Sequence, residues 1–364
     1  PSSILNNNSG RYDYQSILDE KFKFKFSKIK TFNKNEPQVI FYQSDMIFFD
    51  KKGSVIRFDN LSKQKWKSNH YSKTQKKSKP FLFMATHNET LVIADNIAKY
   101  YAININNGNL IWSKNNSSPF NSEIKIYKDK IYIVDLENIL HCFSLIDGKK
   151  IWSHKTENVL IKSQKKLSIV INNNIVYFNN SIGDITAVGA DKGNLIWQLP
   201  TQNNDIYAQS FSLKNSNLVL SNKTIFFSNN RNEFYSVNSE TGFINWKQDI
   251  NSIVQPIIID NIVITVSSKG FLIFIDRLSG NIIRITDILD NYNEKKRSKI
   301  TPIGFVVGTK NIYLTLNNGR LLVVDIQKGK TEEIIKIDGN KISKPFVRNN
   351  ALYIIKDNAV IRFE

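Results

Sequence analysis

Short runs in which apolar and polar residues alternate, or in which several apolar residues follow one another, recur along the whole chain. The runs are rich in Ile, Val, Phe and Tyr and are bounded by Asn, Asp, Gly or Ser, which is the pattern of β-strands separated by turns. Four such runs follow one another at residues 123–128, 130–135, 140–145 and 150–152. Helical periodicity is nearly absent, so the pattern predicts an all-β protein.

One phrase recurs within this pattern, and every tryptophan of the chain stands at the same point of it. In the clear copies a glycine lies four residues before the tryptophan, as Gly108 does before Trp112. The tryptophans are Trp66, Trp112, Trp152, Trp197 and Trp246, and the glycines are Gly108, Gly148, Gly193, Gly242, Gly280 and Gly329. The first copy has Ser62 in place of the glycine, and the copies around Gly280 and Gly329 have lost the tryptophan.

Successive copies are 38–49 residues apart, which is the length of one four-stranded propeller blade. Residues 351–355 and 359–364 are the second and third strands of an eighth copy whose fourth strand is missing. Residues 21–30 alternate Lys with Phe, as expected of a strand with one buried face, and we predict that they complete this last blade. We therefore predict a flexible tether over residues 1–17 and a single all-β domain over 18–364. This domain is an eight-bladed β-propeller of four-stranded antiparallel blades, with seven blades as the alternative count.

The phrase has a direct physical interpretation. A glycine in the turn between the two outer strands adopts a positive φ without steric cost, and an Asn or Asp shortly before it suits the same turn. The tryptophan then begins the outermost strand, where its flat ring fills the wedge between neighbouring blades. We expect a structural docking role for the five tryptophans and six glycines, with ligand contact as the alternative.

Groups that could carry catalysis or hold a metal are scarce. The single cysteine, Cys142, cannot form a disulfide within the chain. The four histidines, His70, His87, His141 and His154, have no ligand spacing with one another or with the cysteine. No acidic cluster suited to a hard cation, no phosphate-binding glycine loop and no nucleophile elbow is visible. The sequence therefore predicts no catalytic, cofactor-binding or metal-binding residue.

The chain is strongly basic, with a formal net charge of +18. No acidic residue lies between Asp59 and Glu89, whereas seven lysines fall between residues 63 and 79, and a smaller basic group occupies 294–299. Two interpretations stay open: an ordinary solvated surface, or loops that bind an anionic glycan, lipid or acidic partner. The basic loops lack the interleaved aromatic residues of a single-strand binding platform, so no nucleic-acid partner is expected.

The repeat resembles the tryptophan-docking repeat shared by the pyrroloquinoline quinone dehydrogenases and the BamB lipoproteins, whose consensus is Ala-x-Asp-x-x-Thr-Gly-x-x-x-Trp. The resemblance runs from about residue 18 to the end of the chain. Alanine is retained at Ala102 and Ala187, aspartate at Asp276 and Asp325, and threonine at Thr241.

The resemblance implies two functions. The dehydrogenases generally use a vicinal cysteine pair, a calcium ion and an aspartate base, whereas this chain has one cysteine, few acids and the length of a bare propeller. The BamB lipoproteins are non-enzymatic propellers of the Gram-negative periplasm. The resemblance thus favours a periplasmic scaffold of the outer-membrane β-barrel assembly machinery, and a quinone- and calcium-dependent dehydrogenase is the alternative.

For the scaffold function, the family's partner is the barrel assembly protein, bound through its periplasmic repeats, with other assembly lipoproteins as further partners. We expect the chain to be a monomer. The resemblance also implies that a lipidated cysteine, which would lie outside the given sequence, holds the protein at the outer membrane. The family's contact motif is a Leu-x-Leu-Arg stretch after the third docking tryptophan, followed by an acidic pair. The nearest match is Leu160, Ile161 and Lys162, where lysine replaces arginine; residues 212–216 do not supply the acidic pair.

Overall fold

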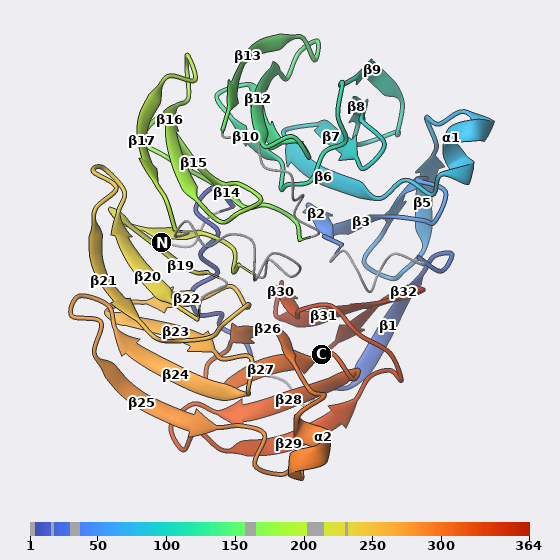
Figure 1. The fold of residues 1–364 in the computed structure, drawn as a ribbon. Helices are drawn as coiled ribbons and strands as arrows, with labels where there is room; N and C mark the ends of the chain where they lie inside the picture. Colours follow the sequence, from blue (N-terminus) through green and yellow to red (C-terminus); the bar gives the residue numbers. More distant parts are fainter. Residues whose placement is uncertain (1–3, 16–17, 30–36, 157–164, 202–214, 230–231) are drawn as a thin grey trace. The chain divides into compact units, whose positions relative to one another are not determined.

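The structure is a computed structural model that describes residues 4–15, 18–29, 37–156, 165–201, 215–229 and 232–364. Within these ranges the strands form eight four-stranded sheets (Figure 1). The prediction of an all-β, eight-bladed β-propeller is confirmed, and the alternative of seven blades is wrong. The sheets are numbered as blades 1–8 in the order in which their first three strands occur.

The strands of blades 1–4 follow the chain in order. They are β2 (Ile40–Tyr42), β3 (Asp45–Phe49), β4 (Val55–Phe58) and β5 (Gln64–Ser68); β6 (Leu82–His87), β7 (Thr90–Asp95), β8 (Lys99–Asn104) and β9 (Leu110–Asn115); β10 (Lys125–Tyr127), β11 (Lys130–Val134), β12 (Ile139–Ser144) and β13 (Lys150–Lys155); and β14 (Ile169–Asn172), β15 (Ile175–Asn179), β16 (Ile185–Gly189) and β17 (Leu195–Leu199).

Blades 5–7 continue the same order, and blade 8 takes its fourth strand from the N-terminus. The strands are β18 (Val219–Ser221), β19 (Thr224–Ser228), β20 (Phe234–Asn238) and β21 (Ile244–Gln248); β22 (Ile257–Ile259), β23 (Ile262–Val266), β24 (Phe271–Asp276) and β25 (Ile282–Asp287); β26 (Pro302–Val307), β27 (Asn311–Leu316), β28 (Arg320–Asp325) and β29 (Thr331–Lys336); and β30 (Phe346–Arg348), β31 (Ala351–Lys356), β32 (Ala359–Phe363) and β1 (Glu20–Lys25). Strand β1 pairs with β32, so the predicted closure of the last blade by the N-terminal strand is confirmed.

The described chain divides into two compact units. The blade 1–4 unit comprises residues 24–213 and 357–359, and the blade 5–8 unit comprises residues 1–23, 214–356 and 360–364. The assignment of residues 18–364 to one domain stays a prediction.

Burial within a blade explains the sequence pattern of its strands. In blade 3 the second and third strands, β11 and β12, are buried at almost every position, so their sequences are nearly continuous apolar runs. The fourth strand, β13, exposes alternate residues and turns Trp152 and His154 inwards. The outer strand therefore keeps the period-two alternation of a half-buried strand.

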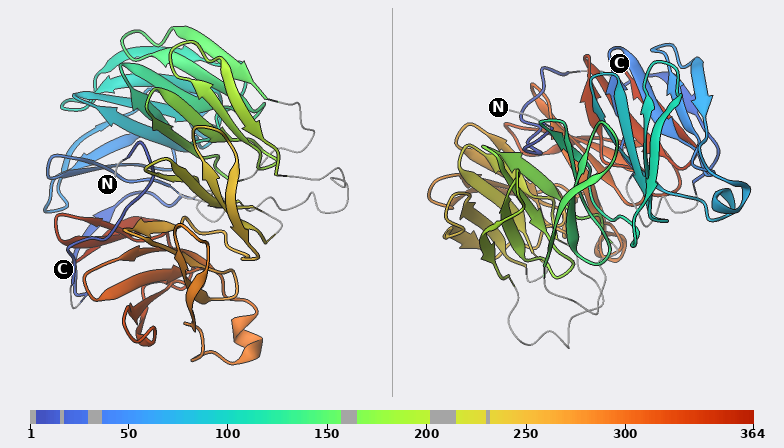
Figure 2. Two further views of the ribbon diagram at one scale, coloured as in Figure 1. Left: turned by 90° about the vertical axis from the view of Figure 1, so that its left-hand side faces the viewer. Right: turned by 90° about the horizontal axis from the view of Figure 1, so that it is seen from above.

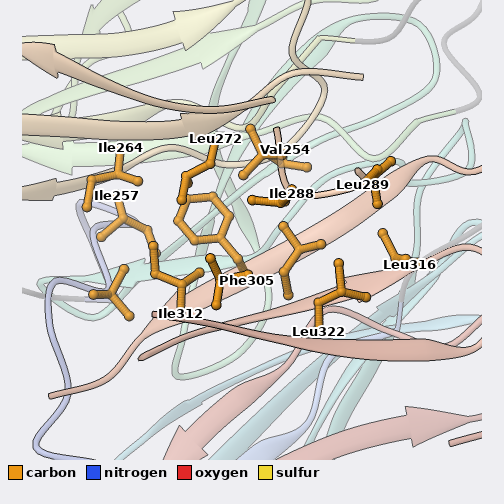
Figure 3. Packing of buried hydrophobic residues seen from close by; sticks show 14 of the residues in the cluster. Val254, Ile257, Ile264, Leu272, Ile288, Leu289, Phe305, Ile312, Leu316 and Leu322 are labelled. Atoms are coloured by element: carbon orange, nitrogen blue, oxygen red, sulfur yellow. The ribbon is translucent and has the colours of Figure 1, made fainter. Parts of the chain in front are cut away.

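Apolar side chains from neighbouring sheets fill the space between them. In the blade 5–8 unit, one cluster joins Ile264 and Leu272 of blade 6 to Ile312 and Leu322 of blade 7, with Phe305 lying among them (Figure 3). All five side chains are at most 6% exposed. Burial of each side chain of this size stabilises the fold by about 1.5–3 kcal/mol, so packing between blades makes a large contribution to stability.

The N-terminal stretch lies along the first strands of blades 5–7. Leu220 N donates to Asn6 O (2.9 Å), Ile258 N donates to Asn8 Oδ1 (3.1 Å), and Tyr12 N donates to Val307 O (2.8 Å). The strand residues in these bonds, Leu220, Ile258 and Val307, belong to β18, β22 and β26. The N-terminal stretch therefore satisfies backbone groups at three sheet edges. Part of the range expected to be a tether is thus hydrogen-bonded to the sheets.

Within the described residues, two short helices lie in the connections between blades. Helix α1 (Lys73–Lys77) connects blades 1 and 2, and α2 (Glu294–Arg297) connects blades 6 and 7. Both project from the sheets to which they are joined (Figure 2). None of the helices in the described ranges is long and apolar enough to cross a membrane.

Candidate functional site

The repeated phrase folds as a turn followed by a β-bulge. In blade 2, Asn104 Oδ1 accepts from the backbone N–H of Asn106 (2.9 Å), and Gly108, at φ +75°, donates its N–H to Asn104 O (2.8 Å). The register between β8 and β9 then shifts, because Ala102 pairs with Trp112 whereas Ile103 pairs with Leu110. A bulge rotates the following side chain relative to a regular strand, which brings the indole of Trp112 towards the next blade.

The indole N–H of four tryptophans donates to the next blade at an equivalent carbonyl. Each acceptor lies three residues before the glycine of the following copy of the phrase. The bonds run from Trp66 to Ile105 O (3.1 Å), from Trp112 to Leu145 O (2.9 Å), from Trp152 to Ala190 O (3.2 Å) and from Trp246 to Arg277 O (3.0 Å). A mostly buried indole N–H thereby has an acceptor, which offsets its desolvation.

Each glycine that faces an indole is required for two physical reasons. Its φ is positive, near +70° in Gly148 and Gly193. A Cβ at Gly148 would also lie 2.6 Å from the Trp112 ring, and a Cβ at Gly193 would lie 2.4 Å from the Trp152 ring. Such distances are shorter than any normal van der Waals contact, so the bare Cα creates the space that the ring occupies.

The copy without tryptophan in blade 6 keeps the same hydrogen bond through another side chain. The guanidinium of Arg284 donates to Ile326 O (2.6 Å) and Gln327 O (2.8 Å), and it lies 4.2 Å from the ring centroid of Phe274. Ile326 stands three residues before Gly329, as the other acceptors do before their glycines. The repeat marks Arg284 as the residue at the tryptophan position, four residues after Gly280, although no docking role was predicted for it.

Two further residues of the phrase are Trp197 and Gly242. Trp197 is 9% exposed and packs against Tyr177 at 5.8 Å between ring centroids. Gly242 adopts φ +77°. The candidate partner-binding residues Leu160, Ile161 and Lys162 lie outside the described residues.

A second recurring device, at the turn after the second strand of a blade, was not identified from the sequence. The Oδ1 atom of Asp50 accepts from the N–H groups two and four residues later, and Asp95 and Asp135 do the same in the next two blades. In blade 4 the amide oxygen of Asn180 accepts from the corresponding residues. Asp and Asn spaced by one blade were the signal that could have revealed it.

The second carboxylate oxygen of these turns binds a different partner in each blade. Asp50 pairs with Lys67 (2.7 Å), Asp95 accepts from the hydroxyl of Tyr71 (2.6 Å), and Asp135 contacts Nε2 of the buried His141 (2.8 Å). Burial favours a raised pKa for Asp50, but the bonds from Lys67 and from the turn amides outweigh it and lower the pKa. For Asp95, burial dominates and raises the pKa despite the bond from Tyr71.

The groups that commonly carry chemistry are buried or dispersed. Burial raises the pKa of the Cys142 thiol to about 12, so the nucleophilic thiolate is scarce at neutral pH. In the described part of the chain, no three residues among His, Cys, Asp and Glu form a group that could hold a metal ion. What the arrangement provides is a set of blades whose side chains form hydrogen bonds to the next blade.

Comparison with known proteins gives a family and a fold. The model of the family of outer membrane protein assembly factor BamB matches residues 51–286, which is more than half of the chain. No curated protein matches the chain in sequence. The solved structure of BamB from Moraxella catarrhalis is similar with a TM-score of 0.73 at 15% identity, over 96% of this chain and 100% of that chain.

Two enzymes are similar in fold as well. A europium-containing methanol dehydrogenase gives a TM-score of 0.70 at 11% identity, over 96% of this chain and 88% of the enzyme. A quinohemoprotein alcohol dehydrogenase from Pseudomonas putida gives 0.66 at 11% identity, over 100% of this chain and 78% of the enzyme. At these identities the likeness shows the fold alone.

Proposed function

The chain belongs to the family of outer membrane protein assembly factor BamB, and from this premise we propose that it is a non-catalytic scaffold of the outer-membrane β-barrel assembly machinery. Its partner would be the barrel assembly protein, which it would bind through that protein's periplasmic repeats. Its place would be the periplasmic side of the outer membrane of a Gram-negative bacterium.

The observation that carries this proposal is the family match over residues 51–286, which extends from blade 1 into blade 6. The fold likeness supports it, because the chain covers the whole of the Moraxella BamB chain but only 78% of the quinohemoprotein dehydrogenase. The hydrogen bonds between blades also suit a scaffold, since loops held on rigid sheets lose little conformational entropy when a partner binds.

We place the partner contact in the connection between blades 3 and 4, where the sequence offers Leu160, Ile161 and Lys162. The connection follows β13, which ends at Lys155, and precedes β14, which begins at Ile169. An apolar anchor beside a cation is a suitable arrangement for an interface centre. Lysine lacks the planar fork of arginine, so we expect Lys162 to contribute long-range attraction more than bidentate bonding.

The test is calorimetric titration of the chain with the periplasmic repeats of the barrel assembly protein from the same organism, at low and high salt. We expect binding that persists at high salt and that Leu160→Glu weakens by about a hundredfold, which corresponds to loss of a central apolar anchor. Leu195→Glu is the matched control, because Leu195 is 52% exposed on the outer strand β17. Absence of binding at both salt concentrations would refute the scaffold proposal.

A quinone-dependent dehydrogenase is the second candidate, because the TM-score to the methanol dehydrogenase is 0.70, close to that for BamB. Pyrroloquinoline quinone and calcium would then stabilise the native state and raise its melting temperature when added together. An increase that needs both ligands, combined with no binding to the barrel assembly protein, would replace the scaffold proposal with this one.

A further inference from the structure

Six exposed or half-exposed lysines gather around helix α1 in the blade 1–4 unit, and we refer to them as the basic face. Two come from the turn between β3 and β4, and four come from the connection between blades 1 and 2. The members of the basic face are Lys51, Lys52, Lys73, Lys76, Lys77 and Lys79.

Direct contacts hold the two segments of the basic face together. The side-chain amide of Asn69 donates to Lys52 O (3.1 Å) and to Ser54 Oγ (3.0 Å). Gly53, at φ +73°, lies so close to Tyr71 and Pro80 that a Cβ there would be 2.7 Å and 2.6 Å from their side chains. The turn and the connection are therefore packed against each other, and their lysines belong to one surface.

Helix α1 begins with its own N-terminal cap, and the residue just before that cap is hydrogen-bonded to blade 2. The Ser72 hydroxyl accepts from Gln75 N (3.2 Å), and the Gln75 side chain accepts from Ser72 N (3.0 Å), which together form a capping box. Just before the helix, the buried Tyr71 donates its hydroxyl to Asp95 (2.6 Å). The helix buries no residue of its own, so packing does not account for its lysines.

The charge of the basic face is not neutralised by neighbouring acids. Lys65 and Lys67, which lie nearby in sequence, pair with Asp45 (2.8 Å) and Asp50 (2.7 Å). In contrast, no salt bridge among the described residues includes any of the six lysines. Asp45 and Asp50 are thus paired with other cations, and Asp95 accepts from the Tyr71 hydroxyl, so none of these acids pairs with a lysine of the basic face.

We propose that the basic face is an electrostatic docking surface for an anionic lipid bilayer. All six cations are lysines, and lysine is a hydrated point charge without the planar fork that arginine uses for bidentate carboxylate or phosphate bonds. Specific protein interfaces are enriched in arginine and depleted in lysine, so a lysine-only face fits a diffuse array of headgroups better than an acidic protein. Each lysine near an anionic membrane surface contributes additively to adsorption.

The test is cosedimentation of the protein with vesicles of phosphatidylcholine mixed with phosphatidylglycerol, and with vesicles of phosphatidylcholine alone. We expect binding only to the anionic vesicles, with loss at high salt because the Debye length shortens. The triple variant Lys73→Glu/Lys76→Glu/Lys77→Glu should reduce the partition coefficient on the order of tenfold or more. The double variant Lys51→Glu/Lys52→Glu, which leaves α1 unchanged, should also reduce the partition coefficient.

The matched control carries the same change of net charge elsewhere in the same unit. Lys114→Glu/Lys150→Glu/Lys192→Glu alters three exposed lysines outside the basic face and should retain binding. Equal losses in the two triple variants would show that net charge alone attracts the vesicles and would overturn the proposal. Absence of binding to anionic vesicles, or binding only to an acidic polypeptide such as polyglutamate, would overturn it too. None of these outcomes bears on the proposed scaffold function.

Discussion

The glycine of the recurring phrase illustrates how a single residue serves the boundary between two blades. Its positive φ closes the turn, and its missing side chain leaves room for the indole of the preceding blade. The two requirements differ in range, since the turn is local whereas the indole comes from about forty residues earlier. A substitution at this position is therefore expected to disturb both the turn and the packing between blades.

At this scale we predict that Gly193→Ala destabilises the protein by about 2–4 kcal/mol. The left-handed backbone conformation is unfavourable for alanine, and the new Cβ would displace the Trp152 ring. Urea unfolding followed by tryptophan fluorescence measures the change. Gly339→Ala is the control, since a Cβ at Gly339 meets nothing within 4 Å, and it should leave the midpoint unchanged. Equal midpoints for the two variants would contradict the prediction.

At the scale of the element, the turn after the second strand shows how one backbone device accepts different side-chain partners. The Oδ1 atom is committed to the turn amides in blades 1–4, so Asp and Asn serve equally well there. The second carboxylate oxygen, Oδ2, distinguishes the blades, because it contacts Lys67 in blade 1 and the hydroxyl of Tyr71 in blade 2. The same substitution is therefore expected to have opposite effects in these two blades.

We predict that Asp50→Asn destabilises the protein at pH 7, whereas Asp95→Asn does not. The pKa of Asp50 is lowered in the folded state, so its stabilising contribution is present above its ordinary pKa of 3.8 and is lost as the pH falls through the folded value. The pKa of Asp95 is raised, so its ionised form opposes folding at neutral pH and a neutral amide relieves this.

Thermal melts of both variants and of the unchanged protein, from pH 7 to below pH 3, check this pair of predictions. The difference between the unchanged protein and Asp50→Asn should shrink towards the acid end. A difference that stays constant with pH would show that the ionised carboxylate of Asp50 contributes nothing to stability.

At the scale of the whole molecule, the last blade depends on a strand from the opposite end of the sequence. Strand β1 pairs with β32, and Phe24 of β1 is buried, with its ring 5.8 Å from that of Phe58. Removal of β1 would leave the backbone groups of β32 at an open sheet edge, which is a site of aggregation.

We predict that deletion of residues 1–27 lowers the melting temperature and promotes association between copies, and that a synthetic peptide of residues 18–28 added in trans restores part of the loss. Differential scanning fluorimetry and light scattering measure the two effects. A peptide with residues 22, 24 and 26 changed from Phe to Ser is the control, because it lacks the buried face. An unchanged melting temperature in the deletion variant would mean that β1 is not needed for closure.

Some properties of this protein follow from the sequence by itself. The strand pattern, the length of the repeat and the incomplete eighth copy led to eight four-stranded blades and to closure by the N-terminal strand. These features are readable because alternation, turn glycines and repeat spacing depend on residues that are near one another in the chain. The family resemblance rests on the same repeat, and the residues proposed to bind the partner stay a prediction.

Other properties were decided only by the tertiary structure. The carbonyl that each indole bonds, the replacement of an indole by Arg284 and the attachment of Asn6 and Asn8 to sheet edges more than two hundred residues away all join distant parts of the sequence. The basic face is of the same kind, since two of its lysines come from a turn that packs on the connection carrying the other four. The position of Arg284 in the repeat is visible in the sequence, but the groups that these residues contact are not, because the contacts form only after the strands have assembled into sheets.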